Sequence, residues 1–311
     1  MQKYSALKNV LPNALINELH DKAMQTTETL RLTYFPEMSM RETLEKYKHS
    51  TPSRFSRAVA YRMMDSETIR TLKPLIEVAA SSFWAQKEYL FYPVYYVRLS
   101  PGRSSGSHLL DSQPHYDKSF GCHAYSFWIP LQVSNRETGG ICLYPDTDVA
   151  AEYVRRNENN RNDFNSYREN SAELDPVLQD NATTYDLEPG DVVTFDSDML
   201  HGATRPGTKD RISFDIRLLS LSEQPKEACS PDLITLFNEH IDVSNALNLM
   251  ALGDKMGARD ILAKMDQDDL PQDIRDILQT FSSRTDLPSP DNLFEISPWQ
   301  SEYAWYHALQ A

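Results

Sequence analysis

The sequence Gln113-Pro-His-Tyr-Asp117 places a histidine and an aspartate two residues apart in the middle of the chain. Neighbouring side chains of an extended strand point to opposite faces, so His115 and Asp117 are predicted to share one face. Their imidazole nitrogen and carboxylate oxygen can then bind a single metal ion. A third ligand has to come from a distant part of the fold, and our candidate is His201, in Asp198-Met-Leu-His-Gly202.

Apolar segments rich in aromatic and β-branched residues surround these candidates and favour a sheet-rich core. A turn of the Pro-Gly-Asp type, Leu187-Glu-Pro-Gly-Asp191, leads into one of these segments shortly before His201. Arg211 stands ten residues after His201 and opens the last segment. The predicted strands cover residues 92–99, 123–132, 141–144, 192–195 and 211–219. Only a folded sheet can bring His201 close to His115 across so much intervening sequence.

Two histidines and one carboxylate on one face of a metal ion form the facial triad of non-haem Fe(II) oxygenases, which leaves positions open for a cosubstrate and oxygen. The order of elements here is His-x-Asp, paired strands, a Pro-Gly-Asp turn, a distal histidine and an arginine on the last strand. This order resembles the Fe(II)/2-oxoglutarate-dependent dioxygenases, and within them the phytanoyl-CoA dioxygenase-like branch. The resemblance implies that His115, Asp117 and His201 bind Fe(II), and that the cosubstrates are 2-oxoglutarate and O2.

The same resemblance assigns Arg211 to the far carboxylate of 2-oxoglutarate. An arginine can bind a carboxylate through two parallel hydrogen bonds, which a lysine cannot reproduce. Ser213 lies two residues further along the same strand face and is expected to donate a hydrogen bond to that carboxylate. Ser126 and Tyr96 are weaker candidates for the cosubstrate site, since each is equally well explained as a packing residue.

Three further residues are candidates for contacts to the substrate or to the residues around the metal. Trp128 shares a strand face with Ser126, and one of the two faces of this strand is expected to line the cavity. Arg98 lies on the predicted strand before His115. His123 begins the strand after it, where an ordinary hydrogen-bonded strand histidine is the simpler interpretation.

The implied fold is α+β, with a double-stranded β-helix (jelly-roll or cupin-like) core, flanking N-terminal helices and a C-terminal helical extension. We expect an oxygenase domain over residues 1–222 and a helical extension over 223–311. Within the first, residues 1–90 are expected to be mainly helical and residues 91–222 to form the β core. The polar insert 146–183 is either a solvated excursion between core strands or a lid over the metal pocket.

The charge and the cysteine content of the chain argue against several classes of binding partner and site. The formal net charge is −14 and the isoelectric point is near 5.0, which argues against nucleic acid or an anionic membrane as the main partner. The three cysteines are widely spaced and include no Cys-x-x-Cys pair, so neither a disulfide framework nor a zinc site is predicted. The sequence begins without the apolar run of a signal peptide and contains no membrane-spanning stretch, so we expect a cytoplasmic protein.

The resemblance implies an enzyme that hydroxylates, desaturates or epimerises a small metabolite and releases succinate and CO2. Halogenating relatives lack the carboxylate ligand so that a halide can take its place, so the presence of Asp117 favours hydroxylation or a related oxidation. The polar insert suits a small polar or cationic substrate, and tailoring of a secondary metabolite is our expectation. The aromatic C-terminal stretch allows a homodimer through the C-terminal helices.

Two alternatives remain open from the sequence. A cupin-like metalloenzyme that does not use 2-oxoglutarate would keep the two histidines and the carboxylate, but would have no reason to place Arg211 and Ser213 where they stand. A non-catalytic binding protein with a vestigial triad would use its helical tail to recruit a partner. A metal-binding assay separates this second alternative from both enzymes.

Overall fold

The computed structural model describes residues 4–47, 54–83, 89–91, 96–100, 102, 114–116, 124–135, 137–157, 178, 180–204, 207–220, 238–285 and 287 of the 311-residue chain. Asp117 and His123 lie outside these residues, as do most of the insert 146–183 and the aromatic C-terminal stretch. Within this part of the chain, no helix is long and apolar enough to cross a membrane.

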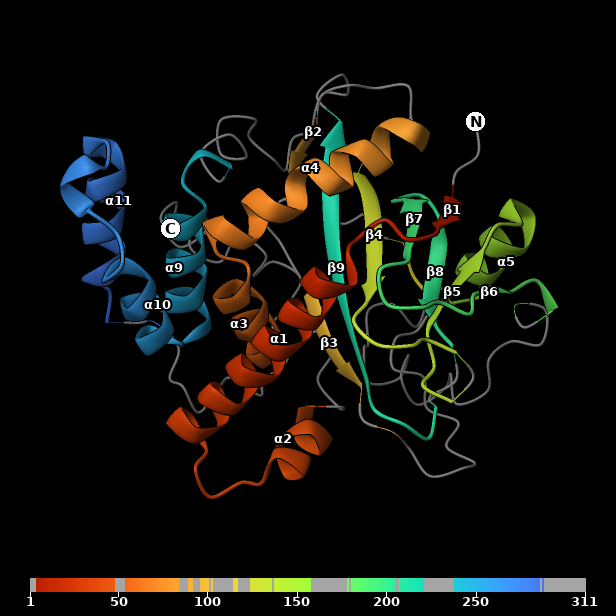
Figure 1. Cartoon of the computed structure of the whole chain (residues 1–311), viewed down its shortest axis with the longest axis horizontal. Helices are drawn as coiled ribbons and strands as arrows, with labels where there is room; N and C mark the ends of the chain where they lie inside the picture. Colours follow the sequence, from red (N-terminus) through yellow and green to blue (C-terminus); the bar gives the residue numbers. More distant parts are fainter. Residues whose placement is uncertain are drawn as a thin grey trace.

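Two antiparallel sheets form the centre of the molecule (Figure 1). The larger sheet has the order β1-β7-β4-β9-β2, and β3 pairs with β9 as well. The smaller sheet has the order β6-β5-β8. The strands of the larger sheet are β1 (Tyr4–Leu7), β2 (Tyr89–Phe91), β3 (Tyr96–Ser100), β4 (Ala124–Pro130), β7 (Val192–Asp196) and β9 (Arg211–Ser220). Those of the smaller sheet are β5 (Ile141–Tyr144), β6 (Thr183–Thr184) and β8 (Leu200–Ala203).

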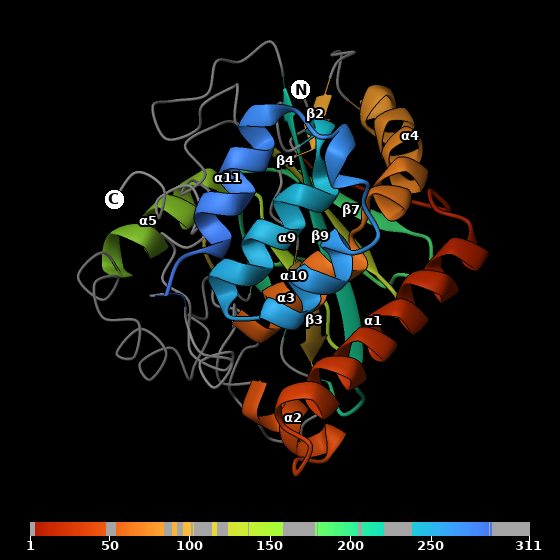
Figure 2. The same ribbon diagram turned by 90° about the vertical axis from the view of Figure 1, so that its left-hand side faces the viewer.

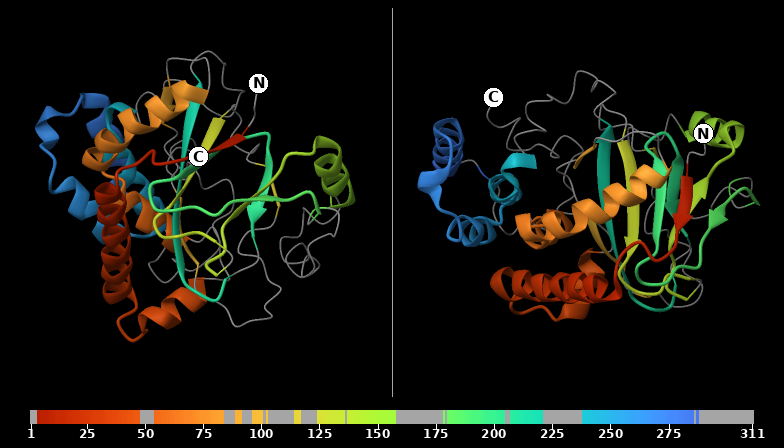
Figure 3. Two further views of the ribbon diagram at one scale, coloured as in Figure 1. Left: turned by 45° about the vertical axis from the view of Figure 1, so that its right-hand side comes forward. Right: turned by 45° about the horizontal axis from the view of Figure 1, so that its top comes forward.

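Helices cover the outer face of the larger sheet, and the smaller sheet lies on its other side (Figure 3). The first five helices are α1 (Asn13–Tyr34), α2 (Met40–Tyr47), α3 (Arg54–Met63), α4 (Ser66–Phe83) and α5 (Thr147–Asn157). Apolar side chains of α1, α3 and α4 share one core with those of β9, for example Ile212, Phe214 and Ile216. Helix α5 instead packs on the outer face of the smaller sheet, where Tyr153 joins Cys142 and Tyr144.

Helix α4 runs without a break through Pro74, although a proline inside a helix usually interrupts it. A proline inside a helix loses one hydrogen bond and costs roughly 3 kcal/mol. Here Pro74 lies on the exposed side of the helix, while Leu72 and Ile76 on either side of it are fully buried. Burial of this continuous apolar stripe offsets the cost of the proline.

A strand that the sequence analysis did not predict begins the described chain. β1 pairs with β7 in the stretch that was expected to be mainly helical, with Tyr4 opposite Phe195 and Leu7 opposite Val192. The Pro-Gly-Asp turn holds β1 in place, because the carbonyl of Gly190 accepts hydrogen bonds from the backbone of Val10 and Leu11 at 2.8 and 3.0 Å. Gly190 has a φ of 98°, which favours glycine at this position.

The C-terminal helices pack directly on the helices of the first half of the chain. They are α9 (Ile241–Leu252), α10 (Lys255–Leu262), a short 3-10 helix (Gln267–Asp269) and α11 (Gln272–Ser282). Every residue of α9 from Val243 to Leu252 is buried. Helix α9 contacts α3, α10 and α11, and Figure 2 shows these helices from the side on which they lie.

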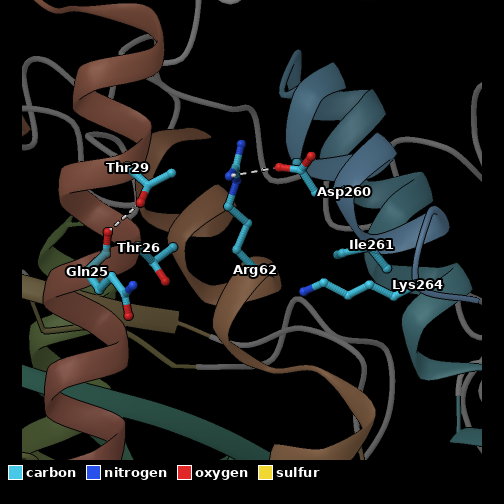
Figure 4. A pocket seen from close by; sticks show the side chains of 8 residues that line it. Gln25, Thr26, Thr29, Arg62, Asp260, Ile261 and Lys264 are labelled. Carbon is cyan, nitrogen blue, oxygen red and sulfur yellow. Dashed lines mark hydrogen bonds and ion pairs between the residues drawn. The ribbon is translucent and has the colours of Figure 1, made fainter.

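A buried carboxylate joins these helices to the rest of the fold. Asp254, at the start of α10, is fully buried and accepts hydrogen bonds from Arg62 Nε and Nη2, both at 2.6 Å. It also accepts from the hydroxyl of Tyr34 at 2.7 Å and from the backbone of Gly257 at 3.0 Å. Arg62 and Gly257 of this junction also line a polar cleft between α1, α3 and α10, together with Gln25, Thr26, Thr29, Asp260, Ile261 and Lys264 (Figure 4).

Candidate active site

The inner faces of the two sheets meet in a small apolar core. Trp128, Val193 and Phe195 of the larger sheet pack here with Ile141 and Leu143 of the smaller one. The register shows which other residues share the inner face, because residues paired across neighbouring strands point to the same side. One row across the larger sheet is Phe195, Ser126 and Arg217, and the next is Val193, Trp128, Asp215 and Tyr96.

The inner face of β9 is polar, in contrast to its outer face. Arg211, Ser213, Asp215 and Arg217 alternate along the strand with Ile212, Phe214, Ile216 and Leu218, which belong to the core shared with the helices. All four polar residues are buried. A buried charged group requires opposite charges or hydrogen bonds around it, so this face indicates a binding site rather than a plain packing surface.

His115 and His201 lie side by side at this site. Their backbones pair as an antiparallel bridge, with hydrogen bonds of 2.8 and 3.0 Å in the two directions. Their ring centroids are 4.4 Å apart, and the His201 ring also lies 4.5 Å from the ring of Phe195. His201 is opposite Leu143 in the smaller sheet and therefore shares the inner face with it.

The orientation of the His201 ring suits a metal ligand. Its Nδ1 lies 3.0 Å from the carbonyl oxygen of Met199, to which the protonated nitrogen can donate. This contact favours the tautomer in which Nε2 carries the lone pair available to a metal ion. His201 is 5% exposed, and the Phe195 ring beside it limits access of water.

The third predicted ligand, Asp117, lies outside the described residues, so its role stays a prediction. Among the residues that the structure does describe, no group of three or more His, Cys, Asp or Glu side chains is placed to hold a metal ion. The structure thus brings two of the three predicted ligands together. Both donors are imidazoles, which suit iron as well as several other transition metals.

Arg211 is buried, with 2% of its surface exposed, and its Nη2 donates to the hydroxyl of Ser100 at 3.0 Å. Its guanidinium carbon lies 5.6 Å from the centre of a ring of Trp128. The hydroxyl of Ser213 on the same strand face is fully buried and has no hydrogen-bond partner among the described residues. A guanidinium and an orphaned hydroxyl on one inner face are the groups that a carboxylate ligand requires.

The other predicted residues form a second polar group on this face. Arg98 Nε donates to Asp215 Oδ2 at 2.8 Å. Burial lowers the pKa of the Arg98 guanidinium, and the positive charge of Arg217 lowers it as well. The attraction of Asp215 outweighs both effects, so the pKa of Arg98 is above its ordinary value. Tyr96 shares a row with Asp215 and Trp128. Ser126 is opposite Arg217, and His123 lies outside the described residues.

Three further buried charged residues, Arg57, Asp215 and Arg217, lie beside Tyr96 or Arg98, and sequence reasoning did not select them as site candidates. The alternation of polar and apolar residues along β9 is a signal that would have revealed Asp215 and Arg217, since a polar face on a fully buried strand has to meet something polar. No comparable signal marks Arg57, because its position depends on how α3 packs against β3.

The two facing antiparallel sheets thus place a histidine pair and a buried arginine on the faces between them, which is the arrangement that the predicted class of enzyme requires. The family follows from a sequence comparison, in which the model of the phytanoyl-CoA dioxygenase (PhyH) family matches residues 6–212. This match covers 207 of 311 residues, and the chain belongs to the phytanoyl-CoA dioxygenase family. Membership confirms the predicted class, a 2-oxoglutarate-dependent non-haem iron enzyme, and its cofactors.

Comparison with curated proteins by sequence finds no significant match. Among solved structures, the chain is similar to SnoN, a non-haem α-ketoglutarate-dependent epimerase from nogalamycin biosynthesis, with 17% identity and a TM-score of 0.46 over 74% of this chain and 83% of SnoN. AviO1 from Streptomyces viridochromogenes Tue57 has 13% identity and a TM-score of 0.46 over 72% of this chain and 92% of AviO1. The non-haem monooxygenase ThoJ, solved as a nickel complex, has 14% identity and a TM-score of 0.43 over 72% of this chain and 76% of ThoJ.

Proposed function

We propose that the protein is an Fe(II)- and 2-oxoglutarate-dependent oxygenase that hydroxylates, desaturates or epimerises a small polar metabolite. We further propose that its two facing sheets form a double-stranded β-helix and that its reaction tailors a secondary metabolite. The observation that carries this proposal is the side-by-side placement of His115 and His201, with ring centroids 4.4 Å apart, in an interior that also contains the buried Arg211.

Separate residues bind the iron and the cosubstrate. His115, His201 and Asp117 hold the iron, and the Met199 carbonyl keeps the His201 ring in the tautomer that can bind it. Arg211 and Ser213 hold the far carboxylate of 2-oxoglutarate, so that the cosubstrate has one orientation in the cavity. When bound, iron would activate O2, and 2-oxoglutarate would be the electron donor that is oxidised to succinate and CO2.

The apolar residues between the two sheets exclude water from the site of the reaction. Trp128, Val193 and Phe195 line the larger sheet beside the polar residues, and each is less than 5% exposed. A water-poor interior strengthens the electrostatic contacts of the buried arginine and limits side reactions. The orphaned hydroxyl of Ser213 supports this arrangement over a cupin-like enzyme without 2-oxoglutarate, which would have no ligand for it.

The test is whether the protein consumes 2-oxoglutarate. Purified protein is incubated in air with Fe(II), 2-oxoglutarate and a panel of small polar metabolites, and succinate is measured. We expect iron-dependent succinate formation that a panel member increases and that His201→Ala abolishes. Succinate formation that persists in His201→Ala would contradict the assigned metal site. Iron binding without any consumption or binding of 2-oxoglutarate would instead favour the cupin-like alternative.

A further inference from the structure

Three guanidinium groups surround the ring of Tyr96. The guanidinium carbon of Arg217 lies 4.9 Å from the ring centre, that of Arg57 lies 5.6 Å away, and that of Arg98 lies 5.7 Å away. Tyr96, Arg57 and Arg217 are each less than 5% exposed. The face of an aromatic ring attracts cations, but three positive charges around one buried ring also repel one another.

Two members of this cluster, Arg217 and Tyr96, lie on the inner face, and Arg57 reaches the Tyr96 ring from α3. Arg217 is in the same row of the larger sheet as Ser126 and Phe195, and the Phe195 ring is in contact with His201. Asp215 and Tyr96 are in the next row. A ligand that contacts Arg217 therefore lies across the inner face from the predicted iron site rather than on the outer surface.

The cluster is distinct from the group of residues assigned to 2-oxoglutarate. Arg211 and Arg217 are six residues apart on β9, which corresponds to roughly 20 Å along an extended strand. Arg211 contacts Ser100 and Trp128, whereas Arg217 contacts Tyr96. The two ends of this strand therefore recognise different chemical groups.

We propose that Arg57, Arg217 and Tyr96 form a second anion subsite that binds an acidic group, a carboxylate or a phosphate ester, on the primary substrate. The proposal rests on the function proposed above and adds the chemical class of the substrate. An incoming anion relieves the repulsion among the guanidiniums whatever other contacts they keep, because each of them gains an opposite charge. The planar donors of arginine match the oxygens of such a group.

The consequence is that the enzyme selects acidic metabolites over cationic ones. Asp215 is already hydrogen-bonded to Arg98 at 2.8 Å, so the carboxylate described on this face is engaged. A positively charged substrate would gain no such attraction from the guanidinium groups of Arg57 and Arg217. The cationic substrate allowed by the sequence analysis is therefore disfavoured, and an organic acid or phosphate ester takes its place.

The test uses benzoate, phenyl phosphate and the neutral benzamide as probes. The protein is loaded with Mn(II) and saturated with 2-oxoglutarate, and the paramagnetic broadening of the probes' aromatic proton signals is recorded by NMR. We expect broadening of benzoate or phenyl phosphate but not of benzamide, and the stronger of the two identifies the acidic group. Arg217→Gln should weaken the binding of that probe by roughly tenfold or more, and Arg217→Lys should weaken it less.

A surface arginine provides the matched control. Arg155 on α5 is 70% exposed, so Arg155→Gln makes the same chemical change without touching the cluster and should leave probe binding unaltered. Circular dichroism and the affinity for 2-oxoglutarate show whether Arg217→Gln retains the native fold. Equal binding of benzamide and benzoate, or equal binding of a probe to wild type and Arg217→Gln, would overturn the proposal. So would a probe that binds the Mn(II)-loaded protein in the absence of 2-oxoglutarate and is released when 2-oxoglutarate is added.

Failure of the proposed function is recognised separately. If the protein bound neither Mn(II) nor 2-oxoglutarate, the oxygenase assignment would fall, and calorimetric titration of benzoate and phenyl phosphate into the metal-free protein would still test the subsite. If the protein bound both but Arg217→Gln weakened 2-oxoglutarate rather than the probes, the cluster would be the cosubstrate site, and the proposal of a substrate subsite would be wrong.

Discussion

Single residues on β9 serve both the stability and the chemistry of this protein. Ile212, Phe214 and Ile216 face the helices, and the alternate residues face the interior between the two sheets. Because side chains alternate at every position of a strand, one ten-residue element supplies both a wall of the core and the polar wall of the site. A substitution on the outer face should therefore lower the stability of the fold, whereas a substitution on the inner face should alter the site.

The first prediction concerns Arg211. Arg211→Lys keeps the charge but loses the two-pronged contact to a carboxylate, so 2-oxoglutarate should bind roughly tenfold or more weakly. Equilibrium dialysis of labelled 2-oxoglutarate with the Mn(II)-loaded protein measures this affinity. The matched control is Arg155→Lys, on the surface of α5, which should leave the affinity unchanged. An unaltered affinity in Arg211→Lys would place the cosubstrate elsewhere.

The second prediction concerns the pH dependence of stability at Asp191. Burial raises the pKa of this carboxyl. Hydrogen bonds from Lys8 Nζ at 2.7 Å and from the backbone N–H groups of Glu188 and Asn9 at 2.9 and 3.0 Å lower the pKa by more than burial raises it, so the net shift is downward. A carboxyl whose pKa is lowered by folding stabilises the fold above its unfolded pKa, near ~4, and this contribution is lost as the pH falls through the lowered value.

Asp191→Asn should accordingly reduce the free energy of unfolding by about 1–3 kcal/mol at pH 7 and by progressively less in acid. Urea unfolding at pH 7 and at a series of acidic pH values gives both numbers. Asp186→Asn is a suitable control, because Asp186 in the same turn region is exposed. A deficit of stability in Asp191→Asn that stayed constant down to the lowest pH would show that its charge plays no part.

At the scale of elements, one helix explains why the C-terminal part of the chain is bound to the rest. Helix α9 is buried along almost its whole length, and the side chain of Asn245 on it donates to the carbonyl of Met64 at 2.6 Å. Gly253 ends the helix with a φ of 97°, and Asp254 then caps α10. The turn between two helices thus places the carboxylate of Asp254 against Arg62 of α3.

The third prediction follows from this buried ion pair. Asp254→Ala leaves the Arg62 guanidinium buried without its main partner, so we expect a loss of about 3–5 kcal/mol in the free energy of unfolding. Asp260 offers a matched control, since it is 65% exposed and lies 3.9 Å from Arg62 Nη1. Asp260→Ala should change stability by less than about 1 kcal/mol. Equal losses in the two variants, measured by urea unfolding, would contradict the role given to Asp254.

The fourth prediction concerns the boundary expected from the sequence at residue 222. Without residues 223–311, the face of α3 that packs on α9 would be exposed, and Arg62 would lose Asp254. We therefore expect a chain of residues 1–222 to be poorly soluble or to bind an apolar dye strongly. Gel filtration and dye binding test this directly, with the full chain as reference. A well-folded, monodisperse fragment would show that the two parts are independent domains.

At the scale of the whole molecule, the sequence predicted the sheet strands better than their surroundings. The strand 141–144 has the predicted bounds, and β4, β7 and β9 differ from the prediction by one or a few residues. These strands consist of β-branched and aromatic residues bounded by turn residues, so local propensity and tertiary structure agree. The short strands β1, β2, β6 and β8 were not predicted, because two to four residues carry little periodic signal and such strands depend on pairing with their neighbours.

The sequence points to part of the candidate site. His115, His201 and Arg211 were selected because their spacing resembles that of a known family. In the structure His201 and Arg211 are buried and His115 is half-buried beside His201, and their roles stay predictions. Arg57 was not predictable, because a helix in the first third of the chain carries it to a ring on β3. Contacts between distant elements of this kind depend on packing angles that no local pattern encodes.

An anaerobic titration of the metal-free protein with Fe(II) and then 2-oxoglutarate tests directly whether iron and the cosubstrate bind together at this site. We expect a visible charge-transfer band when 2-oxoglutarate is added to the iron-loaded protein. This band should be weakened by Arg211→Lys, lost in Asp117→Ala and His201→Ala, and retained in Arg217→Lys. Tight binding of Fe(II) with no band at any concentration of 2-oxoglutarate would contradict the account.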